Sequence, residues 1–239
     1  MKHILQAMIA TTCLGFGVGI GPQSSAMAET HPVVVELYTS QGCSSCPPAD
    51  AMLHDLAARD DVIALALHVD YWDYIGWADI FASPLNTQRQ YAYAHAAEQS
   101  VVYTPQMVVA GKELIVGTKP MEIAQQIMNH ASQDYGVSLT LTRTNNRVQI
   151  TAASEETLPN GAVVQIVRFI PQQTVEIQRG ENAGETLSYA NIVTSWTAVG
   201  EWGGAADWQR RVRVDGDQGV AVIVQEPGPG RILAAQILR

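Results

Sequence analysis

A pair of cysteines separated by two residues is the feature of this sequence that can carry out covalent chemistry. The motif Cys43-Ser44-Ser45-Cys46 follows a β-branched apolar run at 33–38 and precedes apolar residues at helical spacing. A cysteine at a helix N-terminus lies near unpaired backbone N–H groups and the positive end of the helix dipole, which favour the thiolate over the thiol. The thiolate is the species that attacks a disulfide. We therefore predict that Cys43 is an exposed catalytic nucleophile, that Cys46 is a more buried resolving thiol, and that both serines can donate hydrogen bonds toward sulfur.

The same cysteine pair is compatible with two other roles. One is a static structural disulfide, although a ring of four residues removes little entropy from the unfolded chain and is therefore a poor staple. The other is a metal site, because a pair of soft thiolates suits copper(I) or zinc. Zinc would need two more ligands, and the sequence has no second cysteine pair. For copper(I), His68 and Met107 are the candidate additional ligands.

A second candidate feature is the dipeptide Thr104-Pro105, which directly precedes the apolar segment at 106–110. A proline that opens a strand is a position at which a cis peptide bond can occur. The simpler interpretation is an ordinary proline at the start of a strand, but its place downstream of the cysteine motif makes it a candidate for the same site.

Three further candidate residues, His68, Asp70 and Trp72, cluster where a second apolar run at 62–70 ends. In an open α/β sheet the carboxyl ends of the strands face the ligand crevice, so these side chains are candidates to line the site. The simpler alternative is that His68 is a core histidine and that the tryptophan caps the sheet.

The elements that must position these residues alternate between strand and helix in the first half of the chain. The runs at 33–38 and 62–70 predict two strands that are parallel because a helix joins them. After an aromatic insertion at 71–83, the spacing predicts a helix over 84–99, and Gly111-Lys112 separates two short strands of a hairpin.

A last helix is predicted from Pro120, a residue favoured at the first helical position. Its inward side is expected to carry Met121, Ala124, Ile127 and Met128.

From about residue 136 the helical period disappears and alternating segments begin. Strands are predicted at 137–143, 147–153, 162–170 and 174–180, and near 187–197, 208–214, 219–225 and 231–238. Short strands separated by turn signals favour an antiparallel β-sandwich. The loop at 179–184 is interpreted as a solvated turn.

The first 28 residues predict a removable export signal. Lys2 precedes a largely apolar stretch, and Ala26-Met27-Ala28 is a small-x-small cleavage site. We therefore expect a periplasmic or secreted protein in an oxidising compartment, where a cysteine pair can persist as a disulfide. No later apolar run approaches the length of a membrane span, so no stable span is expected after cleavage. The net charge of −9 argues against nucleic acid as a partner.

The strands, the cysteine motif, Thr104-Pro105, the hairpin ending at Gly117 and the helix after it resemble the thioredoxin superfamily. In that superfamily the Thr-Pro peptide is cis and lies against the active-site sulfurs, which implies that Thr104 and Pro105 position the substrate. Two departures limit the resemblance. The tryptophan that precedes the cysteine pair in thioredoxin is Gly42 here, and the Ser-Ser dipeptide means that a redox potential cannot be carried over.

More narrowly, the segments VELYTSQGCSSCPPAD, LHVDYWDYIGWADIFASP, RQYAYA and YTPQMVVAG, together with the β-rich tail, resemble domain-of-unknown-function family 1223. That family comprises bacterial secreted thioredoxin-like proteins. The resemblance spans nearly the whole chain after the signal and implies a fold, but it supplies no reaction.

The sequence thus predicts an export signal at 1–28, an α/β thioredoxin-like domain with a mixed sheet at 29–135, and an all-β antiparallel sandwich-like domain at 136–239. The expected function is thiol–disulfide exchange with a thiol or disulfide protein substrate. The Cys43–Cys46 disulfide would be the redox group, with no other cofactor. Two alternatives remain open: a periplasmic copper(I)-binding module, and a protein-interaction module in which the β-rich half docks a partner.

Overall fold

The computed structural model describes residues 31–238, so the predicted export signal at 1–28 lies outside the described residues and stays a prediction. The first half contains β1 (Val33–Thr39), α1 (Pro47–Ala57), β2 (Val62–His68), the short 3₁₀ helix η1 (Asp73–Ile75), α2 (Pro84–Ala96), β3 (Gln106–Val109), β4 (Glu113–Val116) and α3 (Pro120–Ala131). The second half contains β5 (Val137–Thr144), β6 (Arg147–Ser154), β7 (Ala162–Glu176), β8 (Thr186–Trp202), β9 (Trp208–Arg213), β10 (Gly219–Gln225) and β11 (Ile232–Leu238).

One large mixed sheet runs through both halves of the chain. Its eight strands follow the order β11-β10-β7-β8-β2-β1-β3-β4. The predicted parallel pairing of β1 with β2 is confirmed, as is the antiparallel hairpin of β3 and β4. The long strands β7 and β8 form an antiparallel hairpin that joins the first half through a parallel bridge between Ala66 of β2 and Ile192 of β8.

This sheet corrects the expectation that the second half would form a sandwich of its own. Four strands of the second half, β7, β8, β10 and β11, extend the sheet of the first half, while β5, β6 and β9 form a separate antiparallel sheet. The smaller sheet packs through Val148 and Ile150 against apolar residues of β7, β10 and β11. Alternating apolar residues indicate a strand with one buried face but do not choose its neighbour, so the sequence could not place these strands. The division into domains at residue 135 stays a prediction.

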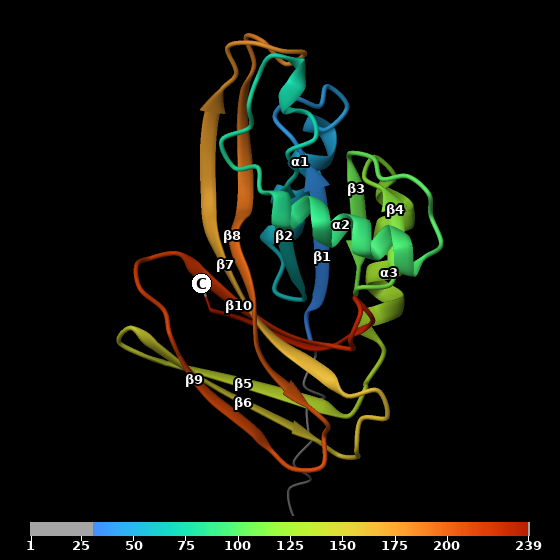
Figure 1. Ribbon diagram of the computed structural model, residues 1–239, viewed down its shortest axis with the longest axis vertical. Coiled ribbons are helices and arrows are strands. Elements are labelled where there is room, and N and C mark those ends of the chain that lie inside the picture. Colours follow the sequence, from blue (N-terminus) through green and yellow to red (C-terminus); the bar gives the residue numbers. More distant parts are fainter. Residues whose placement is uncertain (1–30, 239) are drawn as a thin grey trace, which may run out of the picture.

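A second correction concerns β7. The segments at 162–170 and 174–180, predicted as two strands, form one strand that ends at Glu176. Beyond β10, the distal parts of β7 and β8 continue as a two-stranded arm toward the end of the molecule that holds α1 and η1 (Figure 1).

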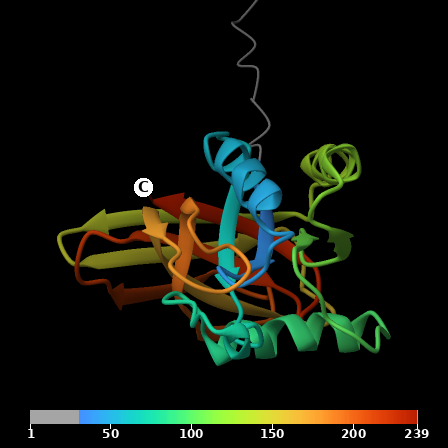
Figure 2. The same cartoon turned by 90° about the horizontal axis from the view of Figure 1, so that it is seen from above.

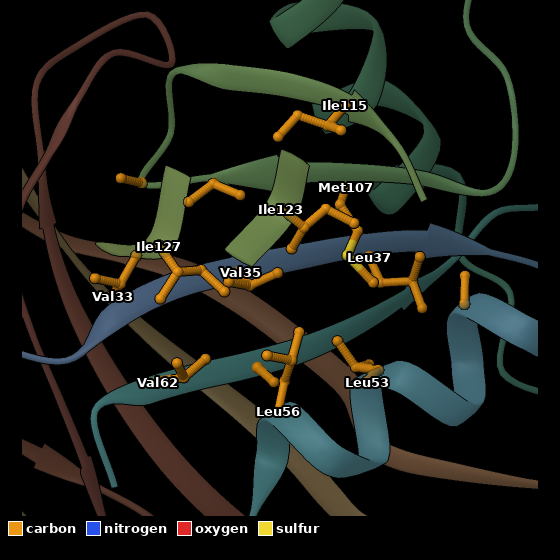
Figure 3. Packing of buried hydrophobic residues seen from close by; sticks show 14 of the residues in the cluster. Val33, Val35, Leu37, Leu53, Leu56, Val62, Met107, Ile115, Ile123 and Ile127 are labelled. Carbon is orange, nitrogen blue, oxygen red and sulfur yellow. The ribbon is translucent and has the colours of Figure 1, made fainter. Parts of the chain in front are cut away.

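Helices cover both faces of the first half of the sheet. Figure 2 shows α1 and α3 on one face and α2 on the other. Leu53 and Leu56 of α1 and Ile123 and Ile127 of α3 pack onto alternate residues of β1 and β2, as Figure 3 shows. Because side chains alternate along a strand, the last residues with this orientation, Thr39 in β1 and His68 in β2, also face α1.

The inward side of α3 differs from the prediction. Ile123 and Ile127 are buried, but Met121 is 82% exposed and Met128 is 58% exposed. Within the described residues, no helix is long and apolar enough to cross a membrane.

Candidate functional site

The cysteine motif lies between the end of β1 and the start of α1, as the sequence predicts. Cys46 is the residue that caps α1, and a disulfide joins it to Cys43 with their Cα atoms 5.4 Å apart. Two backbone bonds shape the loop, from Cys43 N to Ser40 O (3.1 Å) and from Cys46 N to Cys43 O (3.1 Å). The sulfurs therefore lie at the positive end of the α1 dipole.

The first turn of α1 leaves few N–H groups for a thiolate. Pro47 and Pro48 carry no backbone N–H. The next two amides, those of Ala49 and Asp50, both donate to Cys46 O, at 2.9 and 3.1 Å. The helix can therefore stabilise a thiolate mainly through its dipole, and less through direct N–H donation than the sequence analysis assumed.

The exposure of the motif also differs from the prediction. Cys43, expected as an exposed nucleophile, is 2% exposed in the disulfide form, and Cys46 is 0% exposed. Ser44 and Ser45 between them are exposed. The disulfide is therefore covered by other parts of the chain while the dipeptide between the cysteines faces solvent.

The first covering segment is the tip of the β7–β8 arm, residues 177–185, which we call the arm tip. The Asn182 side chain is buried and donates to the carbonyl oxygens of Gln41 (2.9 Å) and Cys43 (3.1 Å). The Ser44 hydroxyl donates to Glu181 Oε2 at 2.7 Å. The loop interpreted as a solvated turn thus lies directly on the cysteine loop, at the top of the molecule in Figure 1.

The second covering segment is the aromatic insertion around η1. A Cβ placed on Gly42 would lie 3.3 Å from both Trp72 Cβ and Ile75 Cδ1, so the insertion packs directly on the residue that precedes Cys43. Trp77 Nε1 donates to Gln41 Oε1 at 2.8 Å. The absence of a side chain at Gly42 is what allows this close approach.

The candidate residues Thr104 and Pro105 lie beside the same helix. Their peptide bond is cis. A Cβ on Gly117 would lie 2.9 Å from Pro105 Cβ and 3.2 Å from Ala49 Cβ, which places Pro105 next to the first turn of α1. Trp72 Nε1 donates to Thr104 Oγ1 at 2.7 Å, so the insertion, this peptide and the cysteine loop meet.

A buried polar cluster lies between the first turn of α1 and the end of β2, and it includes Asp79 and Asp50, which were not among the predicted site residues. Asp50, four residues after Cys46 and hence on the same side of α1, is 5% exposed. Burial raises the pKa of the Asp50 carboxyl to about 7, while the nearby His68 pulls it in the opposite direction. His68 Nδ1 lies 2.6 Å from Asp79 Oδ2, and both side chains are fully buried.

Sequence spacing could have indicated Asp50, since a carboxyl one helical turn after a cysteine shares its face. Asp79 gives no such signal, because the chain between His68 and Asp79 has no regular period. His68 is enclosed by the rings of Phe81 and Tyr189, whose centroids lie 5.2 and 4.8 Å from its own.

Two other candidate residues are held elsewhere. Asp70 Oδ1 accepts a hydrogen bond from the Thr87 hydroxyl of α2 at 2.6 Å. Met107 is fully buried in the apolar cluster that contains Leu37 and Ile115, its neighbours in register. Across the described residues, no group of three or more His, Cys, Asp or Glu side chains is arranged to hold a metal ion.

One of the comparisons with known proteins identifies a family. Residues 34–225 match a family model described as "Protein of unknown function (DUF1223)". A protein from Agrobacterium tumefaciens, known from a crystal structure, is 33% identical to this chain in sequence, and the two structures superpose with a TM-score of 0.76. The match covers 88% of this chain and 95% of that one. No curated protein matches the chain.

Proposed function

The chain belongs to the DUF1223 family of proteins of unknown function, and on that premise we propose that it is an exported thiol–disulfide oxidoreductase. The observation that carries the proposal is the Cys43–Cys46 disulfide at the start of α1, a helix whose first turn lies near Pro105 and carries the buried carboxyl of Asp50. A ring of four residues adds little to stability, so a role in exchange explains the pair better than a role as a staple.

We also propose that the first half is thioredoxin-like. The parallel pair β1 and β2 joined through α1, the β3–β4 hairpin, and the cis Thr104-Pro105 bond support this interpretation. The export signal at 1–28 and a periplasmic or secreted location belong to the same proposal, because an oxidising compartment maintains such a disulfide. The substrate would be a protein that carries a thiol pair or a disulfide.

The exchange can be written with its electrons balanced. A partner thiolate attacks Cys43 Sγ, a new S–S bond forms, and the Cys43–Cys46 bond breaks with its electron pair leaving on Cys46 Sγ. The second partner thiolate then attacks the partner sulfur in the mixed disulfide and releases Cys43 as a thiolate. Two electrons pass from the partner to this protein, and the reverse sequence oxidises the protein's dithiol with a partner disulfide.

Asp50 is the group placed to exchange a proton with Cys46. It lies one turn along α1 on the same face, and its pKa of about 7 allows both protonation states near neutral pH. When Cys46 leaves as a thiolate, a protonated Asp50 would donate to it. When Cys46 attacks as the resolving thiol, an ionised Asp50 would accept its proton.

The test is a redox titration combined with cysteine variants. The wild-type protein is equilibrated in glutathione buffers, quenched with an alkylating agent and weighed by mass spectrometry to give a reduction potential. Cys43→Ser should abolish reduction of insulin, and Cys46→Ser should accumulate mixed disulfides because no second thiol resolves them. If neither substitution changes any redox readout, the proposal is wrong. Metal analysis of the reduced protein tests the copper(I) alternative.

A further inference from the structure

We propose that the arm tip, residues 177–185, is a displaceable cover that makes the disulfide react with extended protein segments in preference to free small thiols. This inference rests on the proposed function and names the substrate class of the same site. The starting observation is that Cys43 is only 2% exposed in the disulfide form, so a covering segment has to move before another sulfur can attack it.

The arm tip has a defined conformation rather than the geometry of a loose turn. Ile177 N donates to Glu185 O at 2.9 Å and Gly184 N donates to Ile177 O at 2.7 Å, which closes the loop at its base. Gly180 and Gly184 adopt φ values of +79° and +88°, which side chains disfavour. The tip is therefore shaped to bring Asn182 down onto the cysteine loop.

The contacts of Asn182 occupy groups that a substrate could use. Its amide donates to the main-chain oxygens of Gln41 and Cys43, two acceptors on either side of Gly42. A backbone N–H or side-chain donor of a partner segment can replace these bonds, because a carbonyl accepts equally from any donor of suitable geometry. A small thiol such as dithiothreitol has hydroxyl donors but no extended backbone to align them with both oxygens and with the disulfide at once.

The cover is held by few interactions and can therefore open. Its polar contacts to the cysteine loop are the two Asn182 bonds and the bond from Ser44 to Glu181, and the last of these is exposed. The arm strands beneath it pair with each other, and a bond between His54 Nε2 of α1 and Ser188 O (2.9 Å) ties the arm to the helix. Ile177 at the base of the tip is fully buried, so opening lifts residues 178–184 and leaves Ile177 in place.

A reagent that reacts only with the open form has its rate scaled by the open fraction. Removing one or two ordinary hydrogen bonds should raise that fraction by about tenfold. A partner segment that donates to the freed oxygens of Gln41 and Cys43 is stabilised on the open form, so it reacts faster than a small thiol at the same open fraction. The rate constant for reduction by a protein segment, divided by the rate constant for reduction by a small thiol, thus measures the preference.

The experiment measures how fast two reductants open the disulfide of the oxidised protein. One is dithiothreitol, which is uncharged, and the other is an unfolded, reduced protein with two cysteines. Asn182→Ala should accelerate reduction by both reductants about tenfold, because both need the open form. In the wild type, the unfolded protein should react with the disulfide faster per thiolate than dithiothreitol does. Glu181→Ala, at an exposed position, should show the same trend more weakly even if Asn182→Ala destabilises the fold.

Gln225→Ala is the matched control. Gln225 of β10 is also buried, at 1% against 6% for Asn182, and its side-chain amide donates to the carbonyl of Gly230 at 2.8 Å. It should leave the dithiothreitol rate within twofold of the wild type. A dithiothreitol rate that neither tip variant changes would overturn the cover. A wild type that the unfolded protein reduces no faster per thiolate than dithiothreitol would overturn the preference.

These outcomes are separable from the proposed function. Faster reduction of Asn182→Ala by dithiothreitol supports the cover whether or not the wild type catalyses exchange between proteins. If the wild type catalyses measurable exchange and the tip variants change no rate, the proposed function stands and the proposed cover is wrong.

Discussion

Replacing Asp50 by asparagine should change how the stability of the protein depends on pH. The folded-state pKa of about 7 exceeds the ordinary value of 3.8 because the carboxyl is buried. Between these two values the folded state binds a proton that the unfolded state does not, so stability falls as pH rises from about 4 to about 7 and then levels off. The difference between the two pKa values corresponds to about 4 kcal/mol in total.

The assay is urea unfolding of the wild type and Asp50→Asn at several pH values between 4 and 8, followed by circular dichroism. Asparagine has nearly the same shape and does not titrate. The free energy of unfolding of the variant, relative to the wild type, should therefore rise by about 4 kcal/mol across this range. Any fixed effect of the amide cancels in that comparison. Parallel pH profiles for the two proteins would refute the reasoning.

Asp61→Asn provides a control with the opposite sign. The hydrogen bond from Arg59 lowers the pKa of Asp61, so its contribution is present above the ordinary carboxyl pKa and lost as pH falls. Relative to the wild type, this variant should lose stability as pH rises through the acid range, whereas Asp50→Asn gains it.

Two further predictions concern the scaffold around the site. Arg89→Met should destabilise the fold by about 3–5 kcal/mol, because Glu36 is fully buried, is bonded to Arg89 Nε at 2.7 Å, and would keep an unpaired charge. Chemical denaturation measures this loss. The double variant with Glu36→Gln should recover most of it. Gly117→Ala should cost about 1–3 kcal/mol and displace Pro105, because the added Cβ would lie 2.9 Å from Pro105 Cβ. Thermal unfolding and the exchange rate would both detect it, and an unchanged melting temperature together with an unchanged rate would contradict the placement of that proline.

The parts of the site that lie close together in sequence could be predicted. The β-branched run of β1, the cysteine motif and the first turn of α1 lie within the consecutive residues 33–50, and local pattern determines them. The β3–β4 hairpin follows from Gly111-Lys112 between two apolar runs. In each case the neighbouring residues contain the physical cause.

The cover over the disulfide could not be predicted, because it depends on contacts between distant segments. Asn182 lies 139 residues from the cysteine whose carbonyl it contacts. Nothing in the loop itself distinguishes a solvated turn from one that packs on another segment. The arm that carries the tip also depends on β7 being one strand, while the segment around Pro171 reads as a break between two.

The orientation of α3 shows a different reason for failure. Apolar residues occur at 121, 123, 124, 127 and 128, so two overlapping faces both have helical spacing. Contacts with β1 and β3 select the face with Ile123 and Ile127, and Met121 and Met128 face solvent. Tertiary packing, which the periodicity does not reveal, determines which face of α3 is buried.

The bridge between β2 and β8 makes the two halves of the chain depend on each other for solubility. β2 is buried at every position of Val62–His68, and β8 lies along its side. A fragment ending at residue 135 would present β2 as a bare apolar edge, which is a template for aggregation. Gene truncations at this point should therefore yield inclusion bodies, because β8 is the strand that covers this edge in the full chain.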